Sequence, residues 1–495
     1  MNGTQLSVQT GLSRVEISGT RRKSVPGGSI PSIPAREGPE NSPSIQPFAF
    51  SISLVLAPLF GEITMKKTLI FAGLACLSFA VHAESYLIEN VRIFNGVDAK
   101  LTSGHVLVED GVIATISSDV IAAPKGVSVI DGGNRVLSPG FIDLHVHLTS
   151  HVPSDQDDAH ATVVGAVAAD VARHFLDSGF TTVRDAGGTH PHLARAIEKG
   201  AVYGPRVFPS GAVLSQTGGH GDWRHGDQPH PTLQGGDPYI QADQAVLVDG
   251  VDQHLMAARE NLRRGATQIK IMGGGGVMSA YDPIHSLQPS PAEIRAAVQA
   301  ASDWGTYVLA HAYTSEAVRR LVDNGVKCIE HGLLIDDATA KYVKQNDVVI
   351  STQLVVYRAL KDLPGITQTN LDKLDVVLKG QENLIGLIKK HKITTGFATD
   401  LIGGMYPMLT REFTERAMYW TPAEVLAQAT SESAKIIRMS GRLNRHGNFG
   451  EIREGWVADL LLINGEPLED ISVLRDPDKN LALIMKGGEI VKRRL

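Results

Sequence analysis

The feature that most constrains this fold is a regular alternation of strand-like and helical segments between residues 141 and 400. The expected strands are Phe141–His147, Thr181–Asp185, Arg206–Gly211, Gln268–Met272, Thr306–His311, Lys327–His331, Val348–Gln353 and Thr394–Asp400. Helical patterns separate them, for example Thr162–Leu176, Val251–Arg264, Pro291–Trp304 and Ser315–Asn324. Eight strands, each followed by a helix, predict an α/β protein with a closed (β/α)8 barrel, the TIM barrel, over residues 140–442.

Short β-rich runs stand on both sides of this region. Residues 84–139 contain YLIENVRIFNG and GHVLVEDGVIATI, and residues 443–495 contain VADLLLINGEPL and LALIMKGGEIVKRR. Period-2 alternation bounded by Gly and Asp-Gly is typical of antiparallel hairpins. We expect the two end segments to form one small β-sandwich beside the barrel.

The first 83 residues carry a different pattern. Residues 1–64 are rich in Ser, Pro, Gly and Arg and are expected to be disordered, or to lie upstream of the true start at Met65. A positive start, a short apolar run and the ending Val81-His82-Ala83 predict a signal peptide over residues 65–83. Export to the periplasm or secretion is the expected localisation. An ordinary buried helix is the alternative.

Charge and cysteine content exclude several classes of protein. The formal net charge of −6 argues against nucleic-acid binding, which normally needs a basic patch. Of the two cysteines, Cys76 lies in the expected signal peptide and Cys328 would remain as a lone thiol. The mature chain is therefore expected to form no internal disulfide and no membrane span.

Polar residues that can bind metals stand at the ends of the expected strands. His145 and His147 close the first strand, and residues i and i+2 of a strand point to the same face, so both imidazoles can reach one ion. The others are His311, His331 and Asp400. A lone histidine is more often structural, but so many in register with the strand ends, where barrel active sites lie, predict a metal centre.

Lys270 lies within the fourth expected strand, in the run QIKIM. Its isoleucine neighbours should point away from the barrel interior, which leaves the lysine pointing inward. A buried ammonium is costly without a partner. A lowered pKa, reaction with CO2 to form an anionic carbamate, and pairing with a buried carboxylate are the three alternatives.

The motifs GFIDLHVHLTS, IKIM, AHAYT, IEHG and FATD together resemble those of the amidohydrolase superfamily. VIDGGNRVLSPG before the barrel and GEIREGWVADLLLING after it extend the resemblance over nearly all of residues 86–495. Within the superfamily the chain is similar to the Xaa-Pro dipeptidase and imidazolonepropionase-like branch and to ochratoxin-hydrolysing amidases. True imidazolonepropionases lack the bridging lysine, so Lys270 counts against that activity.

The resemblance implies a binuclear site. His145, His147 and Asp400 would hold one divalent ion, His311 and His331 the other, and a CO2-derived carbamate on Lys270 would bridge them. Zinc is the expected ion because imidazoles dominate the ligands, and manganese, cobalt and iron are the alternatives. The implied reaction releases a C-terminal amino acid from a dipeptide or an N-acyl amino acid. A metal-bridging hydroxide would attack, and Asp400 would shuttle the proton to the leaving amine.

Two further residues are candidates for contact with substrate. Tyr313 could stabilise the oxyanion, or it could be a packing aromatic at a strand end. His220, in the loop QTGGHGD, could bind a substrate carboxylate or carbonyl, or it could be a structural histidine in a turn.

Several other features are interpreted as structural. The run Gly273–Gly276 lacks the Lys-Ser/Thr of a phosphate-binding loop. Arg184 and Asp185 are expected to pair with each other. Four further histidines are interpreted as solvated loop residues, with a place at the mouth of the site as the alternative: His151, His160, His225 and His230.

Three functions remain open at this point: an amide hydrolase, an enzyme that uses the same site on a lactone, phosphotriester or cyclic amide, and a non-catalytic binding protein. A small-molecule or dipeptide substrate and a homo-oligomeric state are the expected partners.

Overall fold

The computed structural model describes residues 84–151, 161–240 and 243–495. The expected upstream extension (1–64), the expected signal peptide (65–83) and His160 lie outside the described residues. None of the helices in the described part of the chain is long and apolar enough to cross a lipid bilayer.

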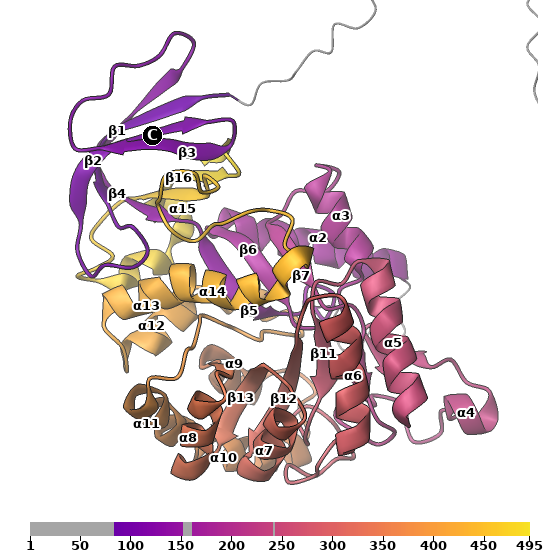
Figure 1. Cartoon of the computed structure of the whole chain (residues 1–495). Helices are drawn as coiled ribbons and strands as arrows, with labels where there is room; N and C mark the ends of the chain where they lie inside the picture. Colours follow the sequence, from indigo (N-terminus) through magenta and orange to yellow (C-terminus); the bar gives the residue numbers. More distant parts are fainter. Residues whose placement is uncertain (1–83, 152–160, 241–242) are drawn as a thin grey trace, which may run out of the picture. The chain divides into compact units, whose positions relative to one another are not determined.

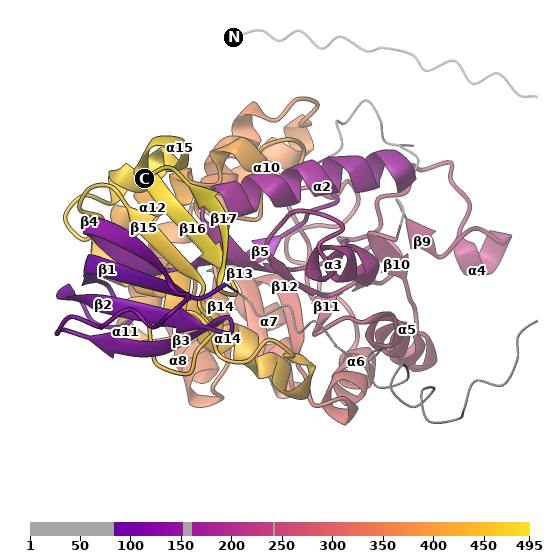
Figure 2. The same cartoon turned by 90° about the horizontal axis from the view of Figure 1, so that it is seen from above.

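The two ends of the described chain meet in one sheet of seven strands. In spatial order these are β17 (Glu489–Arg493), β16 (Leu481–Lys486), β15 (Leu460–Ile463), β4 (Ser128–Pro139), β1 (Tyr86–Ile93), β2 (Thr102–Glu109) and β3 (Val112–Ser117). The C-terminal strand β15 pairs antiparallel with the N-terminal strand β4, with Leu462 opposite Leu137. Figure 2 shows the yellow C-terminal strands beside the indigo N-terminal ones. The expected meeting of the two chain ends is confirmed as this shared sheet, and Val106, Leu137 and Leu462 belong to its apolar core.

The central part of the chain forms two further sheets built mainly from parallel strands. One contains β5 (Phe141–Val146), β6 (Phe180–Asp185) and β7 (Arg206–Pro209) in that order. The other has the order β14 (Val349–Ser351), β13 (Cys328–Leu334), β12 (Val308–Thr314), β11 (Ile269–Met272), β8 (Val213–Ser215), β10 (Ala245–Leu247) and β9 (Tyr239–Ile240). Only the short pair β9–β10 is antiparallel. The strands are buried on both faces, as parallel strands covered by helices must be.

A few backbone hydrogen bonds link these two sheets on both sides. Thr267, just before β11, donates to Pro209 at the end of β7 (2.8 Å). On the other side, Ile350 in β14 donates to Thr394 (3.1 Å), and Leu144 in β5 donates to Phe397 (2.9 Å). The segment after Thr394 therefore connects β14 with β5.

The prediction that Thr394–Asp400 forms a strand is wrong, because the segment takes part in no ladder. The amide of Asp400 donates to the carbonyl of His145 in β5 (2.8 Å), but the donors of two other residues go elsewhere. The amide of Phe397 donates to the carbonyl of Gln428 (3.1 Å), and the amide and hydroxyl of Thr399 donate to the buried carboxylate of Asp143 (3.2 and 2.7 Å). The carboxylate of Asp143 and the carbonyl of Gln428 thus accept hydrogen bonds that a neighbouring strand would accept in a regular sheet.

The expected strand Arg206–Gly211 is also interrupted. It ends at Pro209, and the chain resumes as β8 at Val213. Gly211 has φ +72°, and a Cβ there would lie 2.7 Å from Oδ1 of Asn261. Only glycine tolerates both conditions at little cost. The break lets β7 pair with β6 while β8 pairs with β10 and β11.

The helices named from the sequence are confirmed to within one residue at each end. They are α2 (Ala161–Asp177), α5 (Val251–Arg264), α6 (Pro291–Asp303) and α7 (Ser315–Asp323). Figure 1 shows α5, α6 and α7 beside β11 and β12. The amide of Ser290 donates to Glu293 (2.8 Å), as expected of a capping box at the start of α6. The later helices are α8 (Asp337–Gln345), α9 (Val355–Ala359), α10 (Gln368–Leu378), α11 (Gln381–His391), α12 (Arg411–Ala417), α13 (Pro422–Ala427) and α14 (Ser433–Ile437).

Candidate active site

One cavity of about 740 Å³ contains all the metal ligands expected from the sequence. They come from β5 and its following loop, from β11, β12 and β13, and from the segment that links β14 to β5. These ligands are His145, His147, Lys270, His311, His331 and Asp400. Residues more than 250 positions apart in the sequence therefore meet at one site, at the carboxyl ends of parallel strands.

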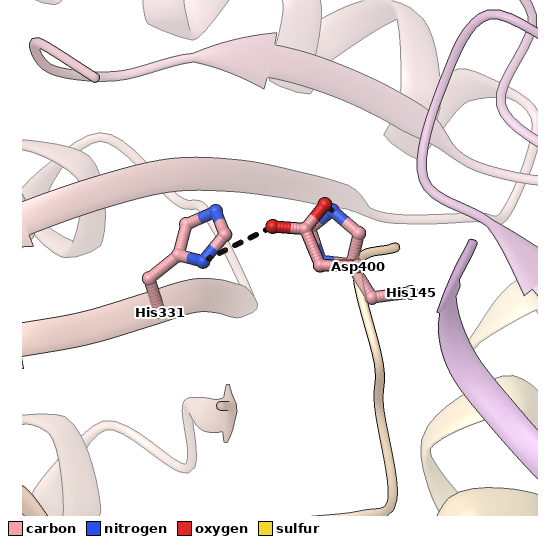
Figure 3. A group of neighbouring side chains, drawn as sticks. All are labelled: His145, His331 and Asp400. Atoms are coloured by element: carbon pink, nitrogen blue, oxygen red, sulfur yellow. Dashed lines mark ion pairs between the residues drawn. The ribbon is translucent and has the colours of Figure 1, made fainter. Parts of the chain in front are cut away.

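Three ligand atoms converge tightly in this cavity. Nε2 of His145 lies 3.1 Å from Nε2 of His147, and Oδ1 of Asp400 lies 3.3 and 3.2 Å from these two atoms. The other carboxylate oxygen of Asp400 faces His331, with Oδ2 3.9 Å from Nδ1. Asp400 therefore lies between two groups of histidines, and Figure 3 shows it between His145 and His331. These three residues could hold one ion together, because their ligand atoms lie within 4.8 Å of one another.

The remaining imidazole nitrogen is already bonded in His145, on β5, and in His147, just after it. Nδ1 of His145 lies 2.6 Å from the carboxylate of Glu330, and Nδ1 of His147 lies 2.7 Å from the carbonyl oxygen of Gly187. An acceptor on one ring nitrogen leaves the other nitrogen unprotonated, which is the form that binds a metal.

The same arrangement holds for the histidines of β12 and β13. Nε2 of His311 lies 3.2 Å from the carbonyl oxygen of Gly275, and Nδ1 of His331 lies 2.8 Å from Oε1 of Gln353. The donor set thus fits divalent cations: an acceptor holds one nitrogen of each imidazole, and in His145 and His147 the other nitrogen, Nε2, faces Asp400. This fit is the structural ground for considering a metal centre.

Two of these residues adopt an unusual backbone conformation. His331 has φ +76° and Asp400 has φ +56°, values that cost free energy for any residue with a side chain. In a regular strand Glu330 and His331 would point to opposite faces. The left-handed backbone at His331 instead lets both side chains reach His145 or its neighbours.

Lys270 lies in β11 and only 1% of its surface is exposed. Burial disfavours the ammonium and lowers the pKa of Lys270, and the nearby Arg184 lowers it further. The carboxylates of Glu330 and Asp400 act in the opposite direction. The neutral amine is therefore more accessible here than in water, which suits either metal contact or reaction with CO2.

The electrostatics of the cavity favour neutral imidazoles at His145 and His331 around an ionised carboxylate. Burial lowers the pKa of His145 to about 4 and that of His331 to about 3. Burial also acts to lower the pKa of His147, but the hydrogen bond to Asp400 and the charge of that carboxylate outweigh it, so the pKa of His147 is raised. Burial alone would raise the pKa of Asp400, but His145, His147 and His331 outweigh it, so that this pKa is lowered. His145, His331 and Asp400 thus have the protonation state that metal ligation requires.

The structure places both candidates for substrate contact in the same cavity. The ring of His220 stacks on that of His311 with centroids 4.2 Å apart, and its Nδ1 lies 2.8 Å from the hydroxyl of Ser279. Tyr313 is 3% exposed, and its ring lies 4.9 Å from that of His311. Tyr313 is hydrogen-bonded to Tyr357, whose hydroxyl lies 2.9 Å from Nδ1 of His331.

The glycine run after β11 provides space for this cluster. A Cβ on Gly276 would lie 1.9 Å from Cε1 and Nδ1 of the His220 ring. The carbonyl of Gly275 bonds His311, as described above. The interpretation that the run is no phosphate cradle agrees with this role in the packing of two histidines.

Sequence reasoning missed the side chains that hold the ligands, chiefly Glu330, Gln353 and Tyr357. The sequence did contain a signal for Glu330. The motif IEHG contains this carboxylate within the buried strand β13, and the buried strand β6 contains the guanidinium of Arg184. Buried charges normally pair. Nothing in the sequence marks Gln353 or Tyr357.

Two further expectations were wrong. Arg184 does not pair with Asp185 but with Glu330 (2.5 Å), while Asp185 accepts hydrogen bonds from the backbone amides of Leu148 and Gly187 (3.0 Å each). His151 is 3% exposed and lines the cavity, where solvent exposure was expected. It packs against Tyr406 with ring centroids 5.3 Å apart. His225 is exposed, as expected, whereas His230 is only partly exposed and its side chain caps the start of α4 (Pro231–Gln234).

Comparisons with known proteins agree with this geometry. The sequence profile of the amidohydrolase family matches residues 136–491. Ochratoxinase of Aspergillus niger is 28% identical over 474 residues, covering 90% of this chain and 92% of that protein. The crystal structure of an amidohydrolase, 37% identical, matches with a TM-score of 0.78 over 83% of this chain and 100% of that chain. That of a prolidase complexed with N-methylphosphonate-L-proline, 35% identical, matches with a TM-score of 0.76 over the same shares.

Proposed function

The chain belongs to the amidohydrolase family, and from that premise we propose that it is a binuclear metal-dependent hydrolase that releases an amino acid from a dipeptide or an N-acyl amino acid. The observation that carries the proposal is the convergence of His145, His147 and Asp400, whose ligand atoms lie 3.1 to 3.3 Å apart. The similarity to an ochratoxinase and to a prolidase supports amide hydrolysis.

The proposed ligands divide into two sets. His145, His147 and Asp400 would hold one ion, His311 and His331 would hold the other, and Lys270 would bridge the two as a carbamate. Lys270 forms the carbamate when its neutral amine adds to CO2 and loses one proton. When bound, divalent ions, which we propose to be zinc, would lower the pKa of a water to about 7 and polarise the scissile carbonyl.

Asp400 is proposed as the proton shuttle. Its carboxylate is ionised and lies between both groups of histidines, so it can accept a proton from the attacking water and pass it to the leaving amine. Because Asp400 lies between both groups of histidines, the same carboxylate can accept the proton from water and then donate it to the leaving amine.

His220 and Tyr313 are proposed to contact the substrate. Burial lowers the pKa of His220 to about 4, so its imidazole is neutral at pH 7 and offers a hydrogen bond without a charge. Tyr313 keeps its proton because burial raises its pKa, so its hydroxyl remains a donor for the oxyanion.

The walls of the cavity favour a substrate with apolar groups on both sides of the amide. Among the described lining residues, Asp400 is the sole carboxylate, and it belongs to the proposed metal centre. A lysine or arginine side chain of a substrate would find no other anionic partner there. The apolar wall includes Trp223, Met278, Val356, Leu360, Leu363 and Ile402. Large apolar residues such as Phe or Pro are therefore the proposed side chains.

Architecture and location complete the proposal. We infer that residues 140–442 form a closed (β/α)8 barrel, supported by the hydrogen bonds that join the two parallel sheets on both sides. Residues 84–139 and 443–495 would form a β-sandwich domain around their shared sheet. The signal peptide over residues 65–83, the periplasmic or secreted location, the homo-oligomeric state and the lack of nucleic-acid partners remain expectations from the sequence.

A substrate panel tests the function. It would contain Xaa-Phe, Xaa-Pro and Xaa-Arg dipeptides, aromatic N-acyl amino acids, a lactone, a phosphotriester and a cyclic amide, each assayed with metal-loaded protein. We expect the highest kcat/KM for an amide with apolar groups on both sides. Preference for the lactone, phosphotriester or cyclic amide would contradict the proposed bond, and preference for Xaa-Arg would contradict the proposed side chains.

A further inference from the structure

A chain of buried polar side chains runs behind the cavity, from Arg184 on β6 through Glu330 on β13 to His145 on β5. Oε1 of Glu330 lies 2.5 Å from Nη2 of Arg184, and Oε2 lies 2.6 Å from Nδ1 of His145. We propose that Glu330, held by Arg184, is a positioning residue that fixes the Nδ1–H tautomer of His145 and so reserves Nε2 for a divalent cation. This inference rests on the proposed function, in which the cavity binds divalent cations.

The guanidinium of Arg184 is held firmly in place. Its Nε donates to the carbonyl of Leu144 (2.6 Å), and Nη1 donates to the hydroxyl of Tyr307 (3.1 Å) and to Sγ of Cys328 (3.3 Å). The side chains of Arg184 and Glu330 are both 0% exposed. A buried guanidinium needs an anionic partner, and Glu330 is the carboxylate with which it forms its ion pair.

The carboxylate of Glu330 selects one tautomer of His145, because an ionised carboxylate can only accept hydrogen bonds. Arginine stays charged in proteins, so the oxygen that accepts from Arg184 belongs to an anion. A carboxylate has only acceptor atoms, so the close contact with His145 requires the histidine to be the donor at Nδ1. The proton then resides on Nδ1, and Nε2 carries the lone pair that faces His147 and Asp400.

Gln353 acts in the same way on a second histidine, because its Oε1 lies 2.8 Å from Nδ1 of His331. Its Nε2 lies 3.1 Å from Nδ1 of His145, but both atoms are donors in the proposed tautomer and form no hydrogen bond, so Glu330 alone accepts from that ring. The amide oxygen accepts from Nδ1 of His331 and leaves Nε2 of that ring for a metal. Its side chain is 0% exposed, so water cannot easily replace it.

The test compares two buried carboxylates in the same molecule. Glu330→Gln keeps the shape of the side chain but offers an amide in place of an obligate acceptor. Glu412→Gln is the matched control: Glu412 is also 0% exposed and lies 2.8 Å from a buried arginine, Arg416, yet it contacts none of the proposed ligands. Metal-free protein is titrated with Zn²⁺ in the presence of a competing chelator, and folding is followed by circular dichroism.

We expect Glu330→Gln to weaken Zn²⁺ binding at one of the two sites by about 10- to 100-fold, the range found when the partner of a metal-binding histidine is removed. Glu412→Gln should lower stability without a change in the Kd for Zn²⁺. Equal weakening in both variants would indicate general loosening and would overturn the proposal. An unchanged Kd in Glu330→Gln would overturn it as well.

A second pair of variants covers the case in which Glu330→Gln does not fold. Arg184→Met/Glu330→Met removes both charges and leaves no ion unpaired, a change that buried pairs often tolerate. Its control is Glu412→Met/Arg416→Met. Weaker Zn²⁺ binding in the first double variant alone supports the proposal, and equal binding in both overturns it. If the unaltered protein itself binds no Zn²⁺, the proposed function fails, a result distinct from failure of the positioning role.

Discussion

At the scale of single residues, the proposed role of Asp400 can be tested most directly by substitution. Asp400→Asn keeps an oxygen ligand but cannot accept a proton in the same way. We expect the metal content to stay close to that of the unaltered protein while kcat falls by about 10²- to 10⁴-fold, the usual contribution of general acid–base catalysis. Metal analysis and kinetics on one preparation would measure both. Substantial turnover with full metal content would remove Asp400 from the proton transfer.

The carbamate on Lys270 yields a second residue-scale prediction. Lys270→Ala should lose bound metal and activity, and short carboxylic acids such as acetate or propionate should restore part of both by occupying the place of the carbamate. Lys327→Ala, which removes an exposed lysine just before β13, serves as the control and should need no rescue. Retained metal in Lys270→Ala, without any effect of added acid, would contradict the bridge.

Much of the site could be predicted at this scale because its ligands are rare residue types in rigid strand positions. His145 and His147 share a strand face, and Lys270 is a charge between isoleucines. The residues that hold them could not be found in this way. Gln353 and Tyr357 have side chains that occur in many environments, and their roles depend on contacts between strands distant in the sequence.

At the scale of elements, the loop after β11 positions two histidines, and this yields a third prediction. Gly276→Ala would place a Cβ 1.9 Å from the ring of His220. The ring must shift, and we expect kcat/KM to fall by about 100-fold, as for misplacement by an ångström. Gly386→Ala in the middle of α11 is the control, because a Cβ there meets nothing within 4 Å. Equal activity of the two variants would show that the position of His220 is unimportant.

The bounds of helices and strands could be predicted where local sequence signals alone mark the ends of a segment. Helix α5 has the predicted bounds, since an apolar face and a terminal glycine, Gly265 (φ +114°), mark it locally. The prediction of strands failed where groups outside the sheet accept hydrogen bonds from the backbone amides of a segment. Thr394–Asp400 looks like a strand, but Gln428 accepts from the amide of Phe397, and Asp143 accepts from that of Thr399. The short strands β8 and β10 were missed because three residues are too few to show a period.

At the scale of the whole molecule, stability should depend on pH through histidines that are buried or, like His446, half-buried. His446, in the segment before β15, packs on Phe208 of β7 with ring centroids 5.7 Å apart, and burial lowers its pKa to about 4. A histidine whose pKa is lower in the folded state stabilises the fold above the unfolded value of about 6.5. That contribution disappears as the pH falls towards 4.

Metal-free protein should therefore lose free energy of unfolding between pH 6.5 and 4, as measured by urea denaturation. His446→Gln should make this loss smaller, because one of the groups that must take up a proton is gone. Other buried histidines, including His151, keep part of the slope. A slope unchanged by the substitution would contradict this role of His446.

The proposed function depends on a cavity in which imidazoles and a carboxylate from distant strands hold paired cations. The most direct test is the metal stoichiometry of the purified full chain, measured by elemental analysis after dialysis and repeated for His145→Ala and for His225→Ala, a substitution of an exposed histidine. We predict two divalent ions per chain in the unaltered protein and in His225→Ala, and a loss of at least one in His145→Ala. Fewer than one ion per chain in the unaltered protein, or full content in His145→Ala, would contradict the proposed function.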